Sequence, residues 1–217
     1  MLREIRKWFM VVMMTVALAS CRIFIMPMIS VSDLSNPDVR VVPVSISTDS
    51  KTCDQPLLDR ITGEFNFYQN IQPMGCFTDK ENLKPFWRTT IPLLRKGDEA
   101  KIPYLSASIY YSQNNSVIVT FNTSFIDALK QRSLGRGTRL TEDVVITFQI
   151  TNDTKKPVRM ATQGVFIDNQ PIGGDMNIVE IKPGGSVWIR LSNVGVNSLL
   201  MDGIEPVGVI PAHRSEP

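Results

Sequence analysis

The chain has 217 residues, of which 43% are apolar and 20% are charged, and its formal net charge is +2 at pH 7. This composition is typical of a folded chain with one or two hydrophobic cores and unlike that of a disordered one. Because the charges nearly balance, the excess of lysine and arginine that marks nucleic-acid-binding domains is missing, and no nucleic-acid partner is expected.

The first 21 residues have the pattern of an export signal. A basic lead is followed by an apolar run over residues 8–18 and then by small residues before a cysteine. The end of this segment resembles the lipobox of bacterial lipoproteins. Its four positions are Leu18, Ala19, Ser20 and Cys21.

The lipobox resemblance implies that residues 1–20 are a signal peptide, and that the Cys21 thiol receives a diacylglycerol. The new amine would also be acylated, for example with palmitate. Two or three acyl chains anchor a protein lastingly, at ~0.8 kcal/mol per buried methylene. Removing Arg3, Arg6, Lys7 and Glu4 with the signal leaves 20 basic and 20 acidic residues, so the exported part is neutral.

Three other interpretations of this segment remain open. A plain secretory signal cut after Ala19 would release a soluble protein. An uncleaved anchor over residues 8–29 is long enough to cross a bilayer, although Arg22 and Pro27 interrupt it. A buried core helix is disfavoured by the basic flank and by the position at the N-terminus.

With Cys21 acylated, Cys53 and Cys76 remain as a pair in a chain sent to an oxidising compartment, which predicts a disulfide between them. Two buried thiols or a redox pair are the alternatives, but the spacing is not Cys-x-x-Cys. No metal site, cofactor or catalytic residue is predicted, because the single histidine, His213, lies in a polar tail.

The predicted elements begin with an apolar leader over residues 23–28, interpreted as a bilayer-proximal segment or a strand packed on the domain. Residues 39–47 follow as a half-buried strand in which Pro43 indicates an edge position or a bulge. Thr52 or Asp54 can cap a helix that begins near Pro56. The two cysteines flank this helix, so a disulfide-stapled strand-helix-strand subdomain is expected.

Further strands are predicted over residues 84–94 and in a hairpin of residues 104–111 and 117–122. A short helix, 125–134, should come next, ending at a cluster of cations. These are Lys130, Arg132, Arg136 and Arg139. They are interpreted either as an anion contact, for example with lipid head groups, or as solvated cations that favour a helix C-terminus.

From residue 141 onward, short strands alternate with turns, as in an antiparallel sandwich. Residues 198–204 and 207–210 are expected to supply a last strand pair. The predicted class is therefore α+β, mostly β. An N-terminal α+β domain over residues 21–134 would precede a β-sandwich-like domain over residues 135–217. Most aromatic side chains should be core. An alternative is that Phe67 and Tyr68, and Tyr110 and Tyr111, form a protein-contact surface.

The order of motifs in residues 1–95 is similar to that of small lipoproteins encoded by tailed phages and prophages of Gram-negative bacteria. Residues 29–34 follow the lipobox, and a cysteine, a leucine-containing helix and a second cysteine then precede a strand ending at residues 91–93. The resemblance implies a lipoprotein made in an infected or lysogenic host. Because Arg22, and not an aspartate, follows Cys21, transfer to the periplasmic face of the outer membrane is expected.

Together these features predict a non-enzymatic, membrane-anchored envelope lipoprotein that binds a protein partner, as in superinfection exclusion or modification of the host surface. One alternative is a peripheral structural lipoprotein of an envelope-spanning secretion or conjugation assembly. Another is a cell-wall hydrolase or a carbohydrate-binding module.

Overall fold

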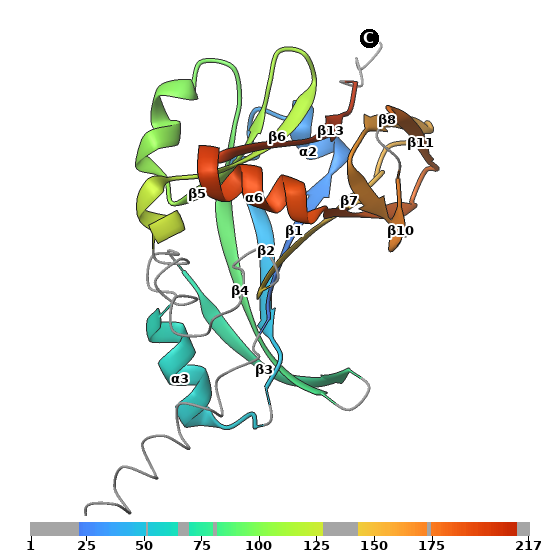
Figure 1. Ribbon diagram of the computed structural model, residues 1–217. Coiled ribbons are helices and arrows are strands. Elements are labelled where there is room, and N and C mark those ends of the chain that lie inside the picture. The colour runs from blue at the N-terminus through green and yellow to red at the C-terminus, as the bar shows by residue number, and fades with distance from the viewer. Residues whose placement is uncertain are drawn as a thin grey trace, which may run out of the picture.

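The computed structural model describes residues 22–50, 52–64, 70–79, 82–127, 143–172 and 175–211. The described part is mostly β-strand, and its strands join into one long curled sheet (Figure 1). The predicted class, α+β and mostly β, is confirmed.

The first half of the chain builds the middle of the sheet. Its strands are β1 (Ile23–Ser30), β2 (Val41–Thr48), β3 (Gln72–Asp79), β4 (Asn82–Leu94), β5 (Ala107–Tyr111) and β6 (Ser116–Phe121). β2 lies between β1 and β4 and is antiparallel to both, while β3 forms a hairpin with β4. β5 runs parallel to the end of β4 and antiparallel to β6, which confirms the predicted hairpin.

The second half extends both ends of the sheet. Its strands are β7 (Val144–Thr151), β8 (Val158–Thr162), β9 (Val165–Ile167), β10 (Gln170–Pro171), β11 (Asn177–Ile181), β12 (Ser186–Leu191) and β13 (Ile204–Val209). The order in the sheet is β10-β9-β12-β7-β1-β2-β4-β5-β6-β13-β8-β11, with β3 beside this path. The short helices α2 (Val31–Ser35) and η1 (Glu99–Tyr104) connect strands of the first half.

Strands from both sides of the predicted domain boundary therefore share one sheet, unlike the separate sandwich expected for residues 135–217. β7 runs parallel to β1, and β13 pairs with β6. The backbone N–H of Ser32 also donates to Oδ1 of Asp153 over 3.0 Å. The reason is mutual burial, since the apolar faces of β1 and β7 cover one core. The boundary at 134–135 lies outside the described residues.

The core follows the two-residue period of the strands. On β7, Val144, Ile146, Phe148 and Ile150 are buried in alternation with half-buried residues, and Ile25 and Ile29 of neighbouring β1 are buried beside them. Burying a side chain of this size contributes about 1.5–3 kcal/mol. The apolar leader at residues 23–28 is thus part of the central strand β1. This confirms its interpretation as a strand packed on the domain.

Pro43 lies in a central strand, so its predicted edge position is wrong for the sheet as a whole. The pairing between β1 and β2 ends at Val44, however, and at Pro43 only β4 is a partner, through Thr90. The missing N–H therefore interrupts no ladder on the β1 side.

A helix replaces the first strand of the pair predicted over residues 198–204 and 207–210, while the second is confirmed by β13. This helix, α6 (Asn193–Asp202), begins at Ser192, whose side chain accepts a hydrogen bond from the N–H of Gly195. It ends at Gly203, which adopts the left-handed conformation that glycine tolerates. α6 lies within the curl of the sheet against β13, β6, β12 and β7 (Figure 1). Val196, Leu199 and Leu200 are buried at helical spacing, and this period was missed.

Candidate binding site

Several predicted site residues lie outside the described part of the chain. They are Cys21, the lipobox residues Leu18, Ala19 and Ser20, and the cations Lys130, Arg132, Arg136 and Arg139. Their predicted roles therefore remain predictions. None of the helices in the described ranges is long and apolar enough to cross a membrane.

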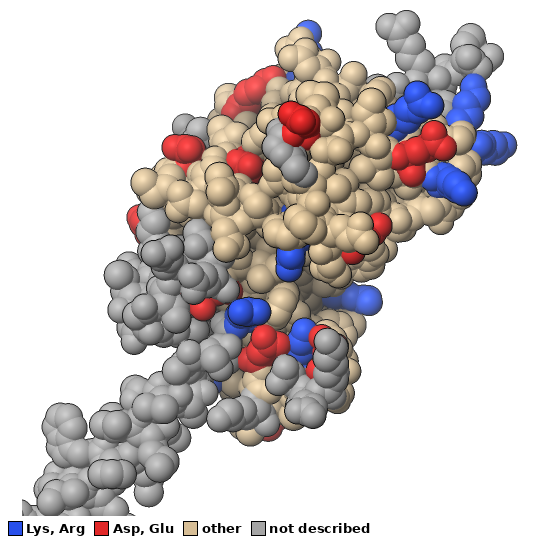
Figure 2. Space-filling model, turned by 45° about the vertical axis from the view of Figure 1, so that its right-hand side comes forward, with Lys and Arg blue, Asp and Glu red and all other residues tan. Residues whose placement is uncertain are grey.

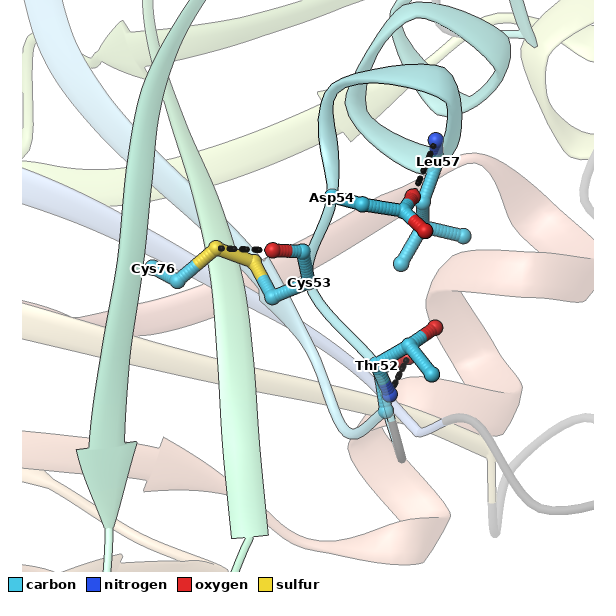
Figure 3. Close-up of a disulfide and its surroundings, with 6 residues drawn as sticks. Thr52, Cys53, Asp54, Leu57 and Cys76 are labelled. Carbon is cyan, nitrogen blue, oxygen red and sulfur yellow. Dashed lines mark hydrogen bonds between the residues drawn. A yellow bond between two sulfur atoms is a disulfide. The ribbon is translucent and has the colours of Figure 1, made fainter.

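The predicted disulfide between Cys53 and Cys76 is present (Figure 3). Cys53 directly precedes Asp54, the cap of helix α3 (Gln55–Glu64), and Cys76 lies in β3. The Cα atoms of the two cysteines are 6.2 Å apart. Asp54 caps the helix through its Oδ1, which accepts a hydrogen bond of 3.0 Å from the N–H of Leu57. The disulfide thus attaches the start of α3 to β3 and completes the predicted strand-helix-strand unit.

Of the aromatic residues considered as a protein-contact surface, Phe67 and Tyr68 lie outside the described residues, and Tyr110 and Tyr111 have structural roles. Tyr111 is buried, and its hydroxyl donates to the carbonyl oxygen of Ile210 over 2.8 Å. The hydroxyl of Tyr110 donates to Glu99 over 2.7 Å, which raises the pKa of the tyrosine. Tyr111 therefore belongs to the core, as expected of most aromatic residues, and is not a protein-contact surface.

A pocket of about 570 Å³ opens where β8 and β13 diverge. Val209 of β13 is paired with Ala161 of β8, and beyond this pair the two strands separate. The hydroxyl of Thr162 still reaches across and donates to the carbonyl oxygen of Val207 over 2.7 Å. The pocket has the size of sites that hold small molecules or protein side chains.

The walls of the pocket are largely apolar. Phe166 and Ile172 line it from the segment around β9 and β10, and Val194 lines it from the first turn of α6. The guanidinium carbon of Arg190 lies over the ring of Phe166, 4.2 Å from its centroid. Cation-π contacts of this kind hold an aromatic ring in place, so Arg190 stabilises the position of Phe166 in the pocket wall.

Glu205 is the one ionisable side chain among the described residues that line the pocket. Burial raises the pKa of its carboxyl, the hydrogen bond from Ser198 lowers it, and the negative charge of Asp202 raises it. Gly195 leaves room for this carboxylate, because a β-carbon there would lie 2.8 Å from Oε1 of Glu205. The acid is therefore held against α6 with an elevated pKa.

Apolar side chains around Glu205 are exposed to solvent. Met176 and Val194 line the pocket and are 67% and 79% exposed, and Met201 is 70% exposed. Val194, Ser198 and Met201 fall on one face of α6, because residues four and three positions apart lie side by side. We call Met176, Val194 and Met201 the apolar patch.

Exposed apolar residues that gather around a pocket mark interaction sites more often than singly exposed ones do. In Figure 2, most of the upper half of one face is tan, with separate acidic side chains at its left and centre and basic and acidic side chains together at its upper right. The surface thus offers large uncharged areas in addition to the pocket.

Sequence analysis missed this pocket because its described lining comes from four separated parts of the chain: Ser116, residues between 161 and 176, residues between 192 and 195, and residues 205–209. Nothing in a linear pattern brings these segments together. The helical spacing of Val194, Ser198 and Met201 was an available signal for one of these segments, but the prediction of a strand there hid it. Within the described ranges, no three potential ligands gather where they could hold a metal ion.

The chain belongs to the family described as Domain of unknown function (DUF7424), whose model matches residues 25–214. The match spans β1 to β13 and both sides of the predicted domain boundary, as the sheet does. No curated protein and no solved structure matches the chain.

Proposed function

We propose that this protein is a non-enzymatic envelope lipoprotein that is anchored through Cys21 and binds a protein partner with the pocket between β8 and β13. The observation that carries the proposal is the apolar patch around this pocket. A rim of exposed methionine and valine side chains is costly to leave in water and suits contact with another protein.

The anchor rests on the lipobox-like residues 18–21 and on the disulfide. A bond between Cys53 and Cys76 fits a chain that folds outside the reducing cytosol. Transfer to the periplasmic face of the outer membrane follows from Arg22 after Cys21, as argued from the sequence.

The geometry of the sheet suits an anchored binding protein. The carbonyl oxygen of Arg22, the first described residue, accepts a hydrogen bond from the N–H of Asp49 beside the hairpin of β3 and β4. Figure 1 shows this hairpin at the lower end of the molecule and β8, β13 and α6 in the upper half. An anchor at Cys21 would lie nearer to this hairpin than to β8, β13 and α6, which contribute to the pocket.

The resemblance to phage-encoded lipoproteins suggests the use of this binding. A lipoprotein made during infection or lysogeny can occupy an envelope protein of its host. The role we propose is exclusion of a second phage or modification of the host surface, with an envelope protein as the partner.

The anchor is tested by mass spectrometry of the mature N-terminus of the full chain produced in a Gram-negative host. We expect an acylated cysteine as the first residue and outer-membrane fractionation, both abolished by Cys21→Ser. An unacylated mature chain in the periplasmic fraction would overturn the anchor.

The binding site is tested by photo-crosslinking in living cells, with the photoreactive residue placed at Val194. The matched control is Met74, an exposed apolar residue on β3. We expect one envelope protein to be crosslinked from Val194 and not from Met74. Equal crosslinking from both positions, or none from Val194, would contradict the proposed site. Recovery of a multi-subunit ring would favour the structural role in an assembly.

A further inference from the structure

We infer that the pocket between β8 and β13 receives a lysine or arginine side chain of the partner protein, flanked by apolar residues, with Glu205 as its counter-ion. This inference rests on the proposed function and specifies the chemistry of the same site.

The charge of the pocket supports a cationic occupant. Glu205 is the one ionisable side chain among its described lining residues, and the ion pairs that the described residues form involve other carboxylates, for example Asp79, Asp98 and Glu180. A carboxylate with apolar neighbours interacts strongly with a cation, because there is little water to screen the pair.

The helix side of the pocket offers the carboxylate a hydrogen-bond partner and room to lie. Ser198 donates a hydrogen bond to it, and the absence of a side chain at Gly195 lets it lie against α6. A carboxylate has about four acceptor positions, so one bond from Ser198 leaves capacity for the N–H groups of a cation. The site is therefore arranged in advance of binding, which lowers the entropic cost.

The shape of the pocket selects a long side chain. Lysine and arginine carry an aliphatic stem that lies along apolar surface while the charged group reaches a polar partner. Phe166, Ile172 and Val207, which line the pocket together with Glu205, provide such a surface. A small inorganic cation would leave these walls without contacts.

The surroundings of the pocket indicate a protein as the source of the cation. Val194 and Met201 are seven residues apart, about two helical turns, and therefore lie on the same face of α6. The apolar patch thus continues along the helix. Met201 is not part of the pocket lining. A free amine that filled the pocket would leave this side chain exposed, whereas a peptide segment with apolar neighbours on each side of its cation would cover it.

The test uses four pentapeptides, acetylated and amidated at their ends, in which a central lysine, arginine, glutamine or glutamate lies between two leucines on each side. The full chain is exported, purified from the cell fraction that holds it and, if membrane-bound, placed in lipid nanodiscs. Affinity is measured by calorimetry near pH 7.5. Lysine and arginine peptides should bind about tenfold more tightly than the glutamine peptide, and the glutamate peptide more weakly still.

Two variants separate this inference from the proposed function. Glu205→Gln should remove the preference for the cationic peptides, so that the lysine, arginine and glutamine peptides bind with similar affinity. Val194→Lys, at the rim of the pocket, should weaken the lysine, arginine and glutamine peptides.

Three results would be decisive against one or both ideas. Equal affinity of the four peptides for the native chain, lost on Val194→Lys, would overturn the cation preference and leave the binding site standing. A cation preference that persists in Glu205→Gln would overturn the role of Glu205. Absence of binding by any peptide, together with no crosslink from Val194 in cells, would overturn both.

Discussion

A β-carbon on Gly195 would lie 2.8 Å from Oε1 of Glu205, so the position of this carboxylate depends on a missing side chain one element away. Gly195 lies in the first turn of α6, and Glu205 follows the helix in β13. The hydrogen bond at Ser192, which caps the helix through the N–H of Gly195, places the glycine at this point.

We therefore predict that Gly195→Ala displaces the Glu205 carboxylate and weakens binding of the lysine pentapeptide about as much as Glu205→Gln does. The fold should tolerate the change, because the atom in the way is the end of a flexible side chain, and alanine favours a helix over glycine by up to about 1 kcal/mol. Calorimetry of the peptides and thermal unfolding measure the two effects.

The matched control is Gly63→Ala on α3, where no atom lies within 4 Å of the added β-carbon. It should leave peptide affinity unchanged. Equal lysine affinity in Gly195→Ala and the native chain would show that the carboxylate position does not matter for binding.

The pKa of Glu205 predicts a pH dependence of binding. Because burial raises this pKa above 4.5, the cation of the lysine pentapeptide loses its counter-ion as the pH falls through a value higher than that of an ordinary glutamate. The glutamine pentapeptide should show no such decline. Calorimetry between about pH 4 and pH 8 tests this, with Glu205→Gln as the control that should remove the difference.

The ionisation of Glu205 should strengthen peptide binding as the pH rises but lower the stability of the fold. A carboxyl whose pKa is higher in the folded than in the unfolded chain is protonated preferentially in the fold. Its contribution to the free energy of unfolding is therefore present at low pH and is lost as the pH rises through the folded pKa. The charge of Asp202 adds to this effect. Denaturant unfolding of the native chain and Glu205→Gln across this range should show the native chain losing stability relative to the variant as pH rises.

Removal of the disulfide should destabilise the strand-helix-strand unit. Cys53→Ser with Cys76→Ser opens a link across 23 residues, which the chain-entropy model values at ~3 kcal/mol. Leu58 is the one described residue of α3 that is fully buried, so α3 has few other contacts to hold it. Hydrogen exchange should show protection lost first in α3 and β3, while β7 and β12 stay protected. Uniform loss across all strands would contradict this local role.

Gly203 should be the least replaceable of the glycines with positive φ. It has φ of 75°, and a β-carbon there would meet the carbonyl oxygen of Phe121 at 2.6 Å. That atom is backbone in β6 and cannot yield easily. Gly184, with φ of 73° and open space around its added β-carbon, is the matched control.

Gly184→Ala should therefore cost only the conformational penalty of roughly 1–2 kcal/mol. Gly203→Ala should cost clearly more, because it adds displacement of β6 from α6. Denaturant unfolding of the two variants measures the difference, and equal costs would show that the contact with Phe121 relaxes freely.

Much of the local structure was predictable because its signals are local. The alternation of Val42, Val44 and Ile46 specified a strand, and Asp54 ahead of Pro56 specified where a helix begins. The pairing of Cys53 with Cys76 followed from the number of cysteines and the expected compartment. α6 was missed, although its cap at Ser192 and its end at Gly203 are also local signals, because its apolar residues were interpreted as a strand.

The sequence by itself determined the class of fold, most strand positions and the disulfide, since side-chain period, turn residues and cysteine count act over a few neighbours. Only the tertiary structure decided that β7 lies beside β1 and that β8 separates from β13. Strand pairing over long separations depends on which apolar faces can cover each other, and no short pattern records that choice. Glu205, an ordinary glutamate in the sequence, becomes the acid of an apolar pocket for this reason.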